Sequence, residues 1–452
     1  MRKIIAILIL PLLLFSCEND FLEETPPTGL SADKLTDLAS MQGLIYGAYG
    51  AIRPFVSQPA LYAAGMMRDV LNRNRGEYDP FYDHEISTSM TSWMYTSGYT
   101  ALASLNKVAV SDLVSMEGSQ EQKNAILGDM HFLRALIYFE LNNYWNHPLT
   151  GYTIPLVLAP VGTDDRLETA TTLAVQDQIE FDIESARSYF LVNSGESNYM
   201  AATALSARIY FYHEKYDSSY ARANEVIESG LFSLGSSVTD AFVPKGNSSE
   251  NIFTIKFNTI DGSGLSPSAR IWEVYQASLL EGNYSLNLDG SAASMIMDPY
   301  DDRFNSFYSA NEDSTMIYVS GKYTTDQMDY RYIRLAEMYL TRAEANIMKS
   351  DAVVQQDVDD INLLRIRGGN PASNLAYIPT VNNALTELYD DRTKELAFEL
   401  GDHFLNTKRL KREIIQTADE GGGTKSYMEY SELLVFPFPE IEVDIHGLTR
   451  IR

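Results

Sequence analysis

Apolar residues recur three and four positions apart through most of the chain, so the dominant predicted element is the amphipathic α-helix. The first such stretch runs from Ser31, a favourable N-cap, to about Ile52. The same spacing predicts further helices over residues 86–108, 126–141, 172–190, 198–212, 220–227, 331–349, 357–367, 384–400 and 403–412. Because each helix keeps an apolar stripe, we expect successive helices to pack against one another.

One pair of predicted helices has a recognisable form. Residues 198–212 and 220–227 flank a break near Tyr216 and carry small residues on the stripes that would face each other, as in a tetratricopeptide-like (TPR-like) hairpin. The later helices suggest more hairpins, although no strict repeat emerges. The sequence therefore predicts a mostly α protein with a TPR-like scaffold, built from residues of about 31–52, 86–231 and 331–412.

Two long segments lack this periodicity. Residues 53–85 are rich in Pro, Asn, Arg and Tyr, and residues 234–330 mix Gly, Ser and Asp turns with short β-like runs such as 251–257. Long irregular insertions in a rigid scaffold usually carry recognition. We therefore expect these two variable segments to hold the ligand site.

The N-terminus has the pattern of an export signal. Arg2 and Lys3 precede an apolar run over residues 4–15, which as a helix would span only about 18 Å of a hydrocarbon core about 30 Å thick. Residues 1–16 are therefore predicted to be a signal peptide. A small residue, Ser16, precedes Cys17, an arrangement that resembles a bacterial lipobox, so we expect Cys17 to be lipidated and residues 17–30 to form an acidic, Pro-rich tether.

Composition and the absence of known motifs exclude several classes of function. The formal net charge of −26 argues against a general nucleic-acid surface, which needs clustered Lys and Arg. A single cysteine excludes an internal disulfide framework and a Cys-rich zinc module. The six histidines form no i, i+4 pair, and no P-loop, Rossmann or nucleophile-elbow motif occurs. The start of a calcium loop at Asn287 lacks its closing Glu, so no metal and no cofactor is predicted.

The strongest enzymatic pattern is a pair of carboxylates, Glu395 and Glu399, which share one face of a predicted helix. Like charges one turn apart repel unless a cation lies between them. Arg365, Arg367 and Arg392 are the predicted cations. We therefore expect a buried ion network and no catalytic residues, and the same interpretation applies to Arg334, Glu337, Arg342 and Glu344.

Aromatic side chains in the variable segments are the candidates for ligand binding. A flat ring can cover the apolar face of a sugar while amide and guanidinium groups bind its hydroxyls. Trp93 is ambiguous between core and surface, and Trp145 is predicted to be core. The candidate ligand-binding residues are Asn72, Arg73, Asn74, Tyr78, Tyr82, Trp272, Tyr275, Tyr284, Tyr300 and Tyr308.

A series of short motifs, in order along nearly the whole chain, resembles the SusD/RagB family of Bacteroidetes surface lipoproteins. The motifs are Cys17–Glu23, Gly128–Phe139 with Ile154–Val157, the 199–234 hairpin, Glu250–Phe253, Asp301–Phe304, Arg331–Ala345, Asn362–Gly368, Arg392–Glu399 and Phe436–Pro439. Their common order along one chain gives the resemblance its weight.

The resemblance implies one SusD-like domain over residues 31–452, held on the exterior of the outer membrane. It implies a receptor that binds a nutrient, first of all an oligosaccharide, and delivers it to a SusC-like TonB-dependent transporter without catalysing a reaction. Two alternatives remain open: a peptide receptor on the same scaffold, and a surface glycoside hydrolase that uses Glu395 and Glu399.

Overall fold

The computed structural model describes residues 35–448 except 73–78, 148–149, 163–164, 194–195, 247, 257–270, 273, 275–283, 289–291, 311–316, 320, 372–373, 418–425 and 429–433. Cys17, the predicted signal peptide and the tether lie outside these residues, as does the predicted N-cap Ser31. No helix of the described part is long and apolar enough to cross a membrane.

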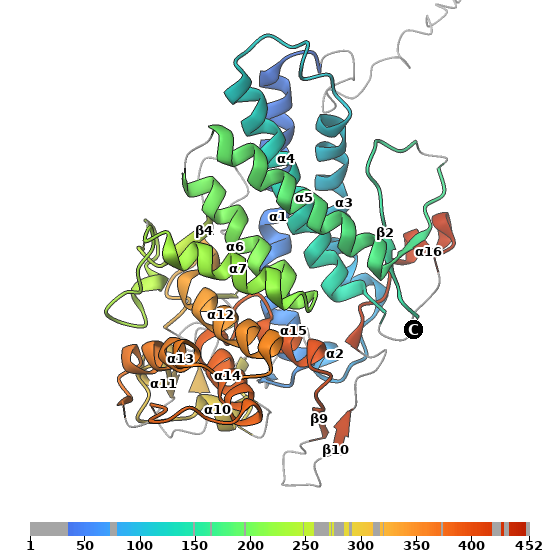
Figure 1. Cartoon of the computed structure of the whole chain (residues 1–452). Helices are drawn as coiled ribbons and strands as arrows, with labels where there is room; N and C mark the ends of the chain where they lie inside the picture. Colours follow the sequence, from blue (N-terminus) through green and yellow to red (C-terminus); the bar gives the residue numbers. More distant parts are fainter. Residues whose placement is uncertain are drawn as a thin grey trace, which may run out of the picture.

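Helices dominate the described chain, which confirms the predicted mostly α fold (Figure 1). The longer helices are α1 (Leu38–Met66), α3 (Thr88–Ala109), α4 (Gln120–Trp145), α5 (Thr172–Asn193), α6 (Glu196–Tyr212), α7 (Tyr216–Glu228), α12 (Leu335–Ser350), α13 (Gln355–Arg367), α14 (Val381–Leu396) and α15 (Asp402–Arg409). Shorter helical segments are α2 (Asp79–Tyr82), η3 (Asp240–Phe242), α10 (Ala293–Ile296), α11 (Asp302–Phe307) and α16 (Glu440–His446).

Successive helices pack side by side along the scaffold. Helix α4 contacts α5, α5 contacts α6, and α6 contacts α7, which in turn contacts α12 across the intervening variable segment. Helix α12 continues the series with α13 and α14 (Figure 1). The predicted helical pair at 198–212 and 220–227 corresponds to α6 and α7, with the break between them just before Tyr216.

Strands are short and come in pairs. They are β1 (Val70–Asn72), β2 (Tyr152–Pro155), β3 (Thr169–Thr171), β4 (Asn251–Ile255), β5 (Tyr284–Leu286), β6 (Ser309–Ala310), β7 (Ile317–Tyr318), β8 (Tyr330–Arg334), β9 (Ile414–Thr417) and β10 (Ser426–Met428). Each described sheet has two antiparallel strands: β1 with β5, β2 with β3, β4 with β8, β6 with β7, and β9 with β10. The β-like run predicted from residue 251 is β4.

Several boundaries differ from the sequence predictions. Helix α14 ends at Leu396 instead of residue 400, so Glu399 lies beyond the helix that carries Glu395, and the two do not share one helix face. Helix α1 continues to Met66, through Pro54 and Pro59, whereas the segment from residue 53 was predicted to be irregular. Proline is a helix breaker, but residues 60–67 are buried in the main core, and their burial favours continuing the helix. Residues 331–334 were predicted as the first turn of a helix, and they form β8, because every residue of that strand is buried against β4 and its surroundings.

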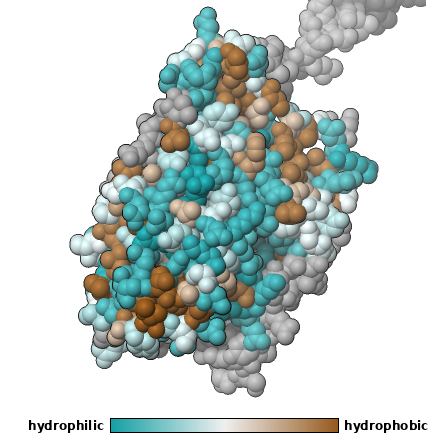
Figure 2. Space-filling view, in the orientation of Figure 1, coloured by the Kyte–Doolittle hydropathy of each residue, from teal (hydrophilic) through white to brown (hydrophobic). Residues whose placement is uncertain are grey.

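The main core lies between the N-terminal helices and the segments that pack on them, and a smaller core joins α12, α13 and α14. Trp145 is fully buried in the main core, as predicted, and its indole Nε1 donates to the Pro437 carbonyl at 3.1 Å. Trp93 is about half exposed on α3. Figure 2 shows a largely hydrophilic face on which apolar residues form small groups, so that face carries no continuous apolar band.

Candidate functional site

The two variable segments meet in the sheet formed by β1 and β5. Its register places Asn72 opposite Tyr284 and Val70 opposite Leu286. Directly opposite residues of an antiparallel pair have their Cβ atoms only ~5 Å apart. Two residues that were predicted separately as ligand contacts are therefore neighbours, although 212 positions separate them in the sequence (284 minus 72).

Hydrogen bonds fix one end of this sheet, beside the Val70–Leu286 pair. The Asn287 backbone amide donates to the Asp69 carbonyl at 2.8 Å, and its side-chain amide donates to the Arg68 carbonyl at 2.9 Å. Asn287 therefore has a structural role beside the sheet. Arg68 has a positive φ of 57°, a conformation that costs a non-glycine residue energy and that the surrounding contacts must hold.

A buried ion pair lies next to the sheet. The Asp69 carboxylate lies 2.7 Å from Nδ1 of His403 in α15, and Nε2 of the same ring lies 3.1 Å from the Tyr389 hydroxyl. Burial alone would lower the pKa of His403, but Asp69 and then Tyr389 outweigh it and raise the pKa to about 10. The imidazole is therefore charged at neutral pH, and its pairing ties the segment before β1 to the C-terminal helices.

The other described candidates occupy different environments. The Tyr82 ring lies beneath the Arg68 guanidinium, 4.4 Å from its centre, and the Tyr82 carbonyl accepts from Arg68 Nε at 2.9 Å. Trp272 is partly buried against the main core. Tyr300 is 79% exposed just before α11. These three side chains are thus not equivalent: only Tyr300 presents most of its surface to solvent.

Tyr308 does not fit the predicted role. Its side chain is only 7% exposed and its ring stacks on Phe304 with a centroid distance of 5.8 Å. The aromatic-rich turn chemistry around it suggested a loop residue, but α11 turns this ring inward, against the core. Arg73, Asn74, Tyr78 and Tyr275 lie outside the described residues, as do the side chains of Asn72 and Tyr284.

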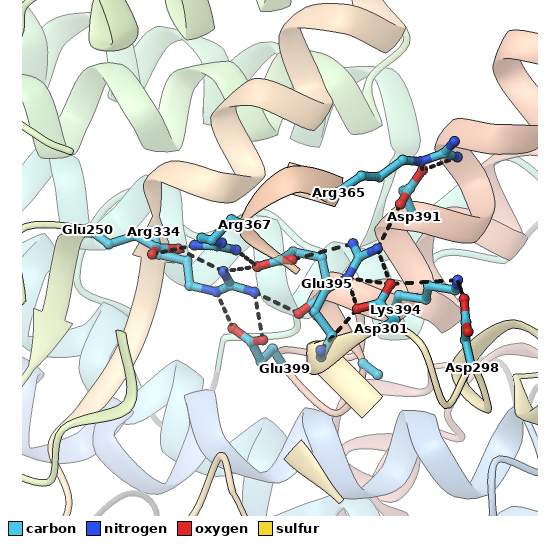
Figure 3. Close-up of polar contacts among 12 residues, drawn as sticks. Glu250, Asp298, Asp301, Arg334, Arg365, Arg367, Asp391, Lys394, Glu395 and Glu399 are labelled. Atoms are coloured by element: carbon cyan, nitrogen blue, oxygen red, sulfur yellow. Dashed lines mark hydrogen bonds and ion pairs between the residues drawn. The ribbon is translucent and has the colours of Figure 1, made fainter. Parts of the chain in front are cut away.

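A buried ion network holds the variable segment against the C-terminal helices (Figure 3). The Arg334 guanidinium, at the junction of β8 and α12, pairs with three carboxylates: Glu250 at 2.8 Å, Glu395 at 2.6 Å and Glu399 at 2.9 Å. Lys322 donates to Glu399 at 2.7 Å and to the backbone carbonyls of Glu395 and Ala397. All of these charged side chains are buried.

The network extends on both sides of Glu395. Arg367 pairs with Glu250 at 2.6 Å and also with Glu395, and Arg303 lies 3.5 Å from Glu395. Arg303 in turn pairs with Asp301 at 2.6 Å and Asp391 at 3.0 Å. Lys394 lies 3.8 Å from Asp301 and 3.3 Å from Asp298, so the side chains in Figure 3 form a continuous chain from Glu250 to Asp298.

The predicted ion network is therefore confirmed, with two of its three cations misassigned. Arg367 does pair with Glu395. Arg365 instead pairs with Asp391 at 2.6 Å, and Arg392 pairs with Asp402 at 2.7 Å. Sequence reasoning missed Glu250 and Lys322 because they come from the irregular segment, where no periodicity indicates which side chains point inward. The other charged residues predicted to be paired are also in buried ion pairs: Arg208 with Glu337, Arg342 with Asp360, and Arg409 with Glu344.

This electrostatic environment does not suit glycoside hydrolysis at Glu395 and Glu399. A general acid needs a raised pKa and access to the substrate. Burial opposes ionisation of both groups, but Arg367, Arg334 and Arg303 lower the pKa of Glu395, and Arg334 and Lys322 lower that of Glu399. Both carboxylates are thus held ionised and away from solvent. Among the described residues, no group of three or more His, Cys, Asp or Glu could hold a metal ion.

The backbone next to Glu399 is strained. Phe398 and Leu400 on either side of it have φ values of 62° and 50°. Tyr323 donates to the Phe398 carbonyl at 2.7 Å, and Lys322 donates to the Ala397 carbonyl at 2.9 Å. Such conformations cost on the order of 1–3 kcal/mol each and persist only where the surroundings hold them. The ion network and these hydrogen bonds supply that constraint.

A mostly helical scaffold with paired short strands in its insertions is the fold of the SusD superfamily. A superfamily structure from Bacteroides thetaiotaomicron aligns with a TM-score of 0.78 over 92% of this chain and all of its own, at 19% identity. A structure titled a SusD-like carbohydrate binding protein, from Bacteroides vulgatus, aligns with a TM-score of 0.73 over 91% of this chain and 97% of its own, at 13% identity.

Sequence comparisons agree with the fold. A family model described as "SusD family" matches residues 258–431, and a second, described as "Starch-binding associating with outer membrane", matches residues 20–211. The chain belongs to the SusD/RagB family. A curated relative, SusD-like protein P25 of Formosa agariphila, is 24% identical over 279 residues, which are 56% of this chain. The match spans about half, 52%, of that relative's length.

Proposed function

We propose that this protein is a lipid-anchored receptor on the outer face of the outer membrane that binds an oligosaccharide and passes it to a SusC-like TonB-dependent transporter. The lipobox-like Ser16-Cys17 pair supports the anchor. The description of the N-terminal family model, starch-binding and associated with the outer membrane, supports both the ligand class and the location.

One observation carries the proposal for the ligand site: β1 pairs with β5, so the two variable segments meet in one sheet with Asn72 opposite Tyr284. The Asp69–His403 pair and the Asn287 hydrogen bonds hold this surface on the scaffold. A preorganised site loses less conformational entropy on binding than a flexible one does. We therefore assign the ligand-binding face to β1, β5 and the residues that flank them.

Affinity electrophoresis in gels that contain soluble polysaccharides tests this assignment. The variants Asn72→Ala and Tyr284→Ala should each weaken retention of the protein by about tenfold in affinity, since losing one stacked ring or one good hydrogen bond costs roughly 1–2 kcal/mol. Tyr46→Ala, an exposed tyrosine on α1, is the matched control and should bind as the wild type does. Equal binding by all four proteins would contradict the assignment.

A peptide ligand is the second candidate, because a two-stranded sheet offers backbone edges that an extended peptide can pair with. Isothermal titration with oligosaccharides and with a random-coil peptide mixture separates the two. Peptide binding that is lost in Tyr284→Ala, without any glycan binding, would replace the oligosaccharide in the proposal. Release of reducing sugar during the same incubations would contradict a purely binding role.

A further inference from the structure

A pocket lies on the scaffold, where helices α4, α6 and α15 end close together. Its cavity volume is about 150 Å³. Its lining includes Asn142, Asn143, Gln176, His213, Lys408 and Lys411. None of these residues belongs to β1, β5 or the variable segments.

Several buried polar atoms of this pocket have no partner within the protein. They are Oδ1 of Asn142, Nδ2 of Asn143 and Nε2 of His213. The His213 side chain is only 3% exposed, and leaving such groups unpaired costs free energy. These atoms therefore indicate a ligand, or ordered solvent, that completes their hydrogen bonds.

The protonation state of His213 determines whether its Nε2 atom donates or accepts a hydrogen bond. Nδ1 lies 2.8 Å from the Glu180 carboxylate, which also pairs with Lys215 at 2.6 Å. Since a carboxylate can only accept, Nδ1 carries the proton of the neutral ring and Nε2 is an acceptor. Burial lowers the pKa of His213 more strongly than Glu180 raises it, which favours the neutral ring. An acceptor and the amide donor of Asn143 thus line the same pocket.

The charges around the pocket nearly cancel. Lys408 donates to the carbonyls of Asn143 at 2.7 Å and Asn146 at 3.4 Å, at the C-terminal end of α4. Each helix C-terminus carries roughly half a negative charge, and α4, α6 and α15 all end here. Burial lowers the pKa of Lys408 to about 7, which reduces its positive charge at neutral pH. Together with Glu214, these ends offset what remains of that charge and the ammonium group of Lys411, and Arg409 is paired with Glu344.

From these groups we infer that the pocket binds an uncharged polyhydroxylated molecule, such as a single sugar unit, at a site separate from the β1–β5 face. A hydroxyl both donates and accepts, so a ring of hydroxyls matches a mixture of amides, a neutral imidazole acceptor and an ammonium donor. An anion would meet unpaired acceptor atoms, and a cation would meet Lys408 and Lys411. The inference stands on the pocket's own residues and does not rest on the proposed function.

Saturation-transfer NMR with D-glucose, D-galactose, D-xylose and L-rhamnose tests the site. At least one sugar should bind the purified protein, and Asn143→Leu should weaken that binding at least about tenfold, the effect of one or two lost hydrogen bonds. Since Asn143 Nδ2 has no partner, this variant should fold normally. Asn382→Leu, at an exposed position of α14, is the matched control.

Three outcomes would overturn the inference. The first is that no sugar binds, or that Asn143→Leu binds as well as the wild type does. The second is that inorganic phosphate or acetate displaces the sugar at equal concentration, which would mean that the ammonium groups select an anion. The third is that Tyr284→Ala abolishes the sugar signal while Asn143→Leu does not, because the sugar would then occupy only the β1–β5 face. His213→Phe, which removes the Nε2 acceptor, should reproduce the effect of Asn143→Leu.

Discussion

Removing the Glu395 carboxylate should destabilise the protein strongly. The carboxylate is fully buried and contacts the guanidinium groups of Arg334 and Arg367, with Arg303 at 3.5 Å. In Glu395→Ala, Glu250 and Glu399 still face Arg334, Arg367 and Lys322, so one positive charge in the buried network is left uncompensated. Breaking a buried pair in this way costs about 3–5 kcal/mol.

Urea unfolding followed by circular dichroism measures this loss as a lower midpoint with an unchanged m-value. Glu387→Ala is the matched control: Glu387 pairs with Arg365 at 2.5 Å, but its side chain is 42% exposed. An exposed pair contributes only about 0–1 kcal/mol, so this variant should unfold near the wild-type midpoint. Glu395→Gln, which keeps the size and polarity of the side chain, should lie between them.

The pH dependence provides a second measure of the same network. Its cations lower the pKa of Glu395 below the unfolded value of 4.5, so the unfolded chain takes up the proton first as the pH falls. The stabilisation is therefore complete above that value and is lost below it. A loss below 1 kcal/mol in Glu395→Ala, or equal losses in the Ala variants of Glu395 and Glu387, would refute the argument that this network stabilises the fold.

Three further predictions concern two candidate ligand residues and the ion pair beside the β1–β5 sheet. Tyr308→Phe removes a buried hydroxyl that has no partner, so the variant should be as stable as the wild type or up to about 1 kcal/mol more stable, as measured by thermal unfolding. Glycan retention should not change, and a clear loss of retention would restore Tyr308 to the site. Asp69→Asn should lower the free energy of unfolding by roughly 3 kcal/mol at pH 6 and should lower the pKa of His403, which NMR measures. Because folding raises that pKa from 6.5 to about 10, the pair stabilises the protein fully below pH 6.5, and this contribution disappears as the pH rises to 10. Equal stability of variant and wild type at pH 6 would contradict the prediction. Trp272→Ala should lower the melting temperature by the equivalent of roughly 2 kcal/mol, since its ring packs on the main core, and an unchanged melting temperature would place the ring outside that core.

The regular helices could be predicted from sequence because their apolar spacing and burial agree. Trp145, at the end of the α4 stripe, is buried as that spacing requires. The pairing of Arg367 with Glu395 could be predicted because a buried carboxylate needs a cation and Arg367 lies in the preceding helix. The limits of α1 could not be predicted, because Pro54 and Pro59 suggest an end that the burial of residues 60–67 overrides.

The sequence provides candidate ligand residues, but it does not indicate which of them lie together. Asn72 and Tyr284 were both recognised as candidates, yet nothing in the sequence indicates that they are cross-strand neighbours, because β1 and β5 are only three residues long. The inward turn of Tyr308 was missed for a similar reason: α11 is six residues long, too short for a periodic pattern.

The pairing of β1 with β5 also determines when this sheet can form. Its two strands leave the ribosome far apart in time, and everything from α2 to β4 is synthesised between them. Pairing of such distant positions is intrinsically slow, because the entropy of closing the long loop between them is lost first. Neither half of the polypeptide alone can assemble this sheet, so under the proposed function retention on a glycan gel would also report that a molecule has completed this pairing.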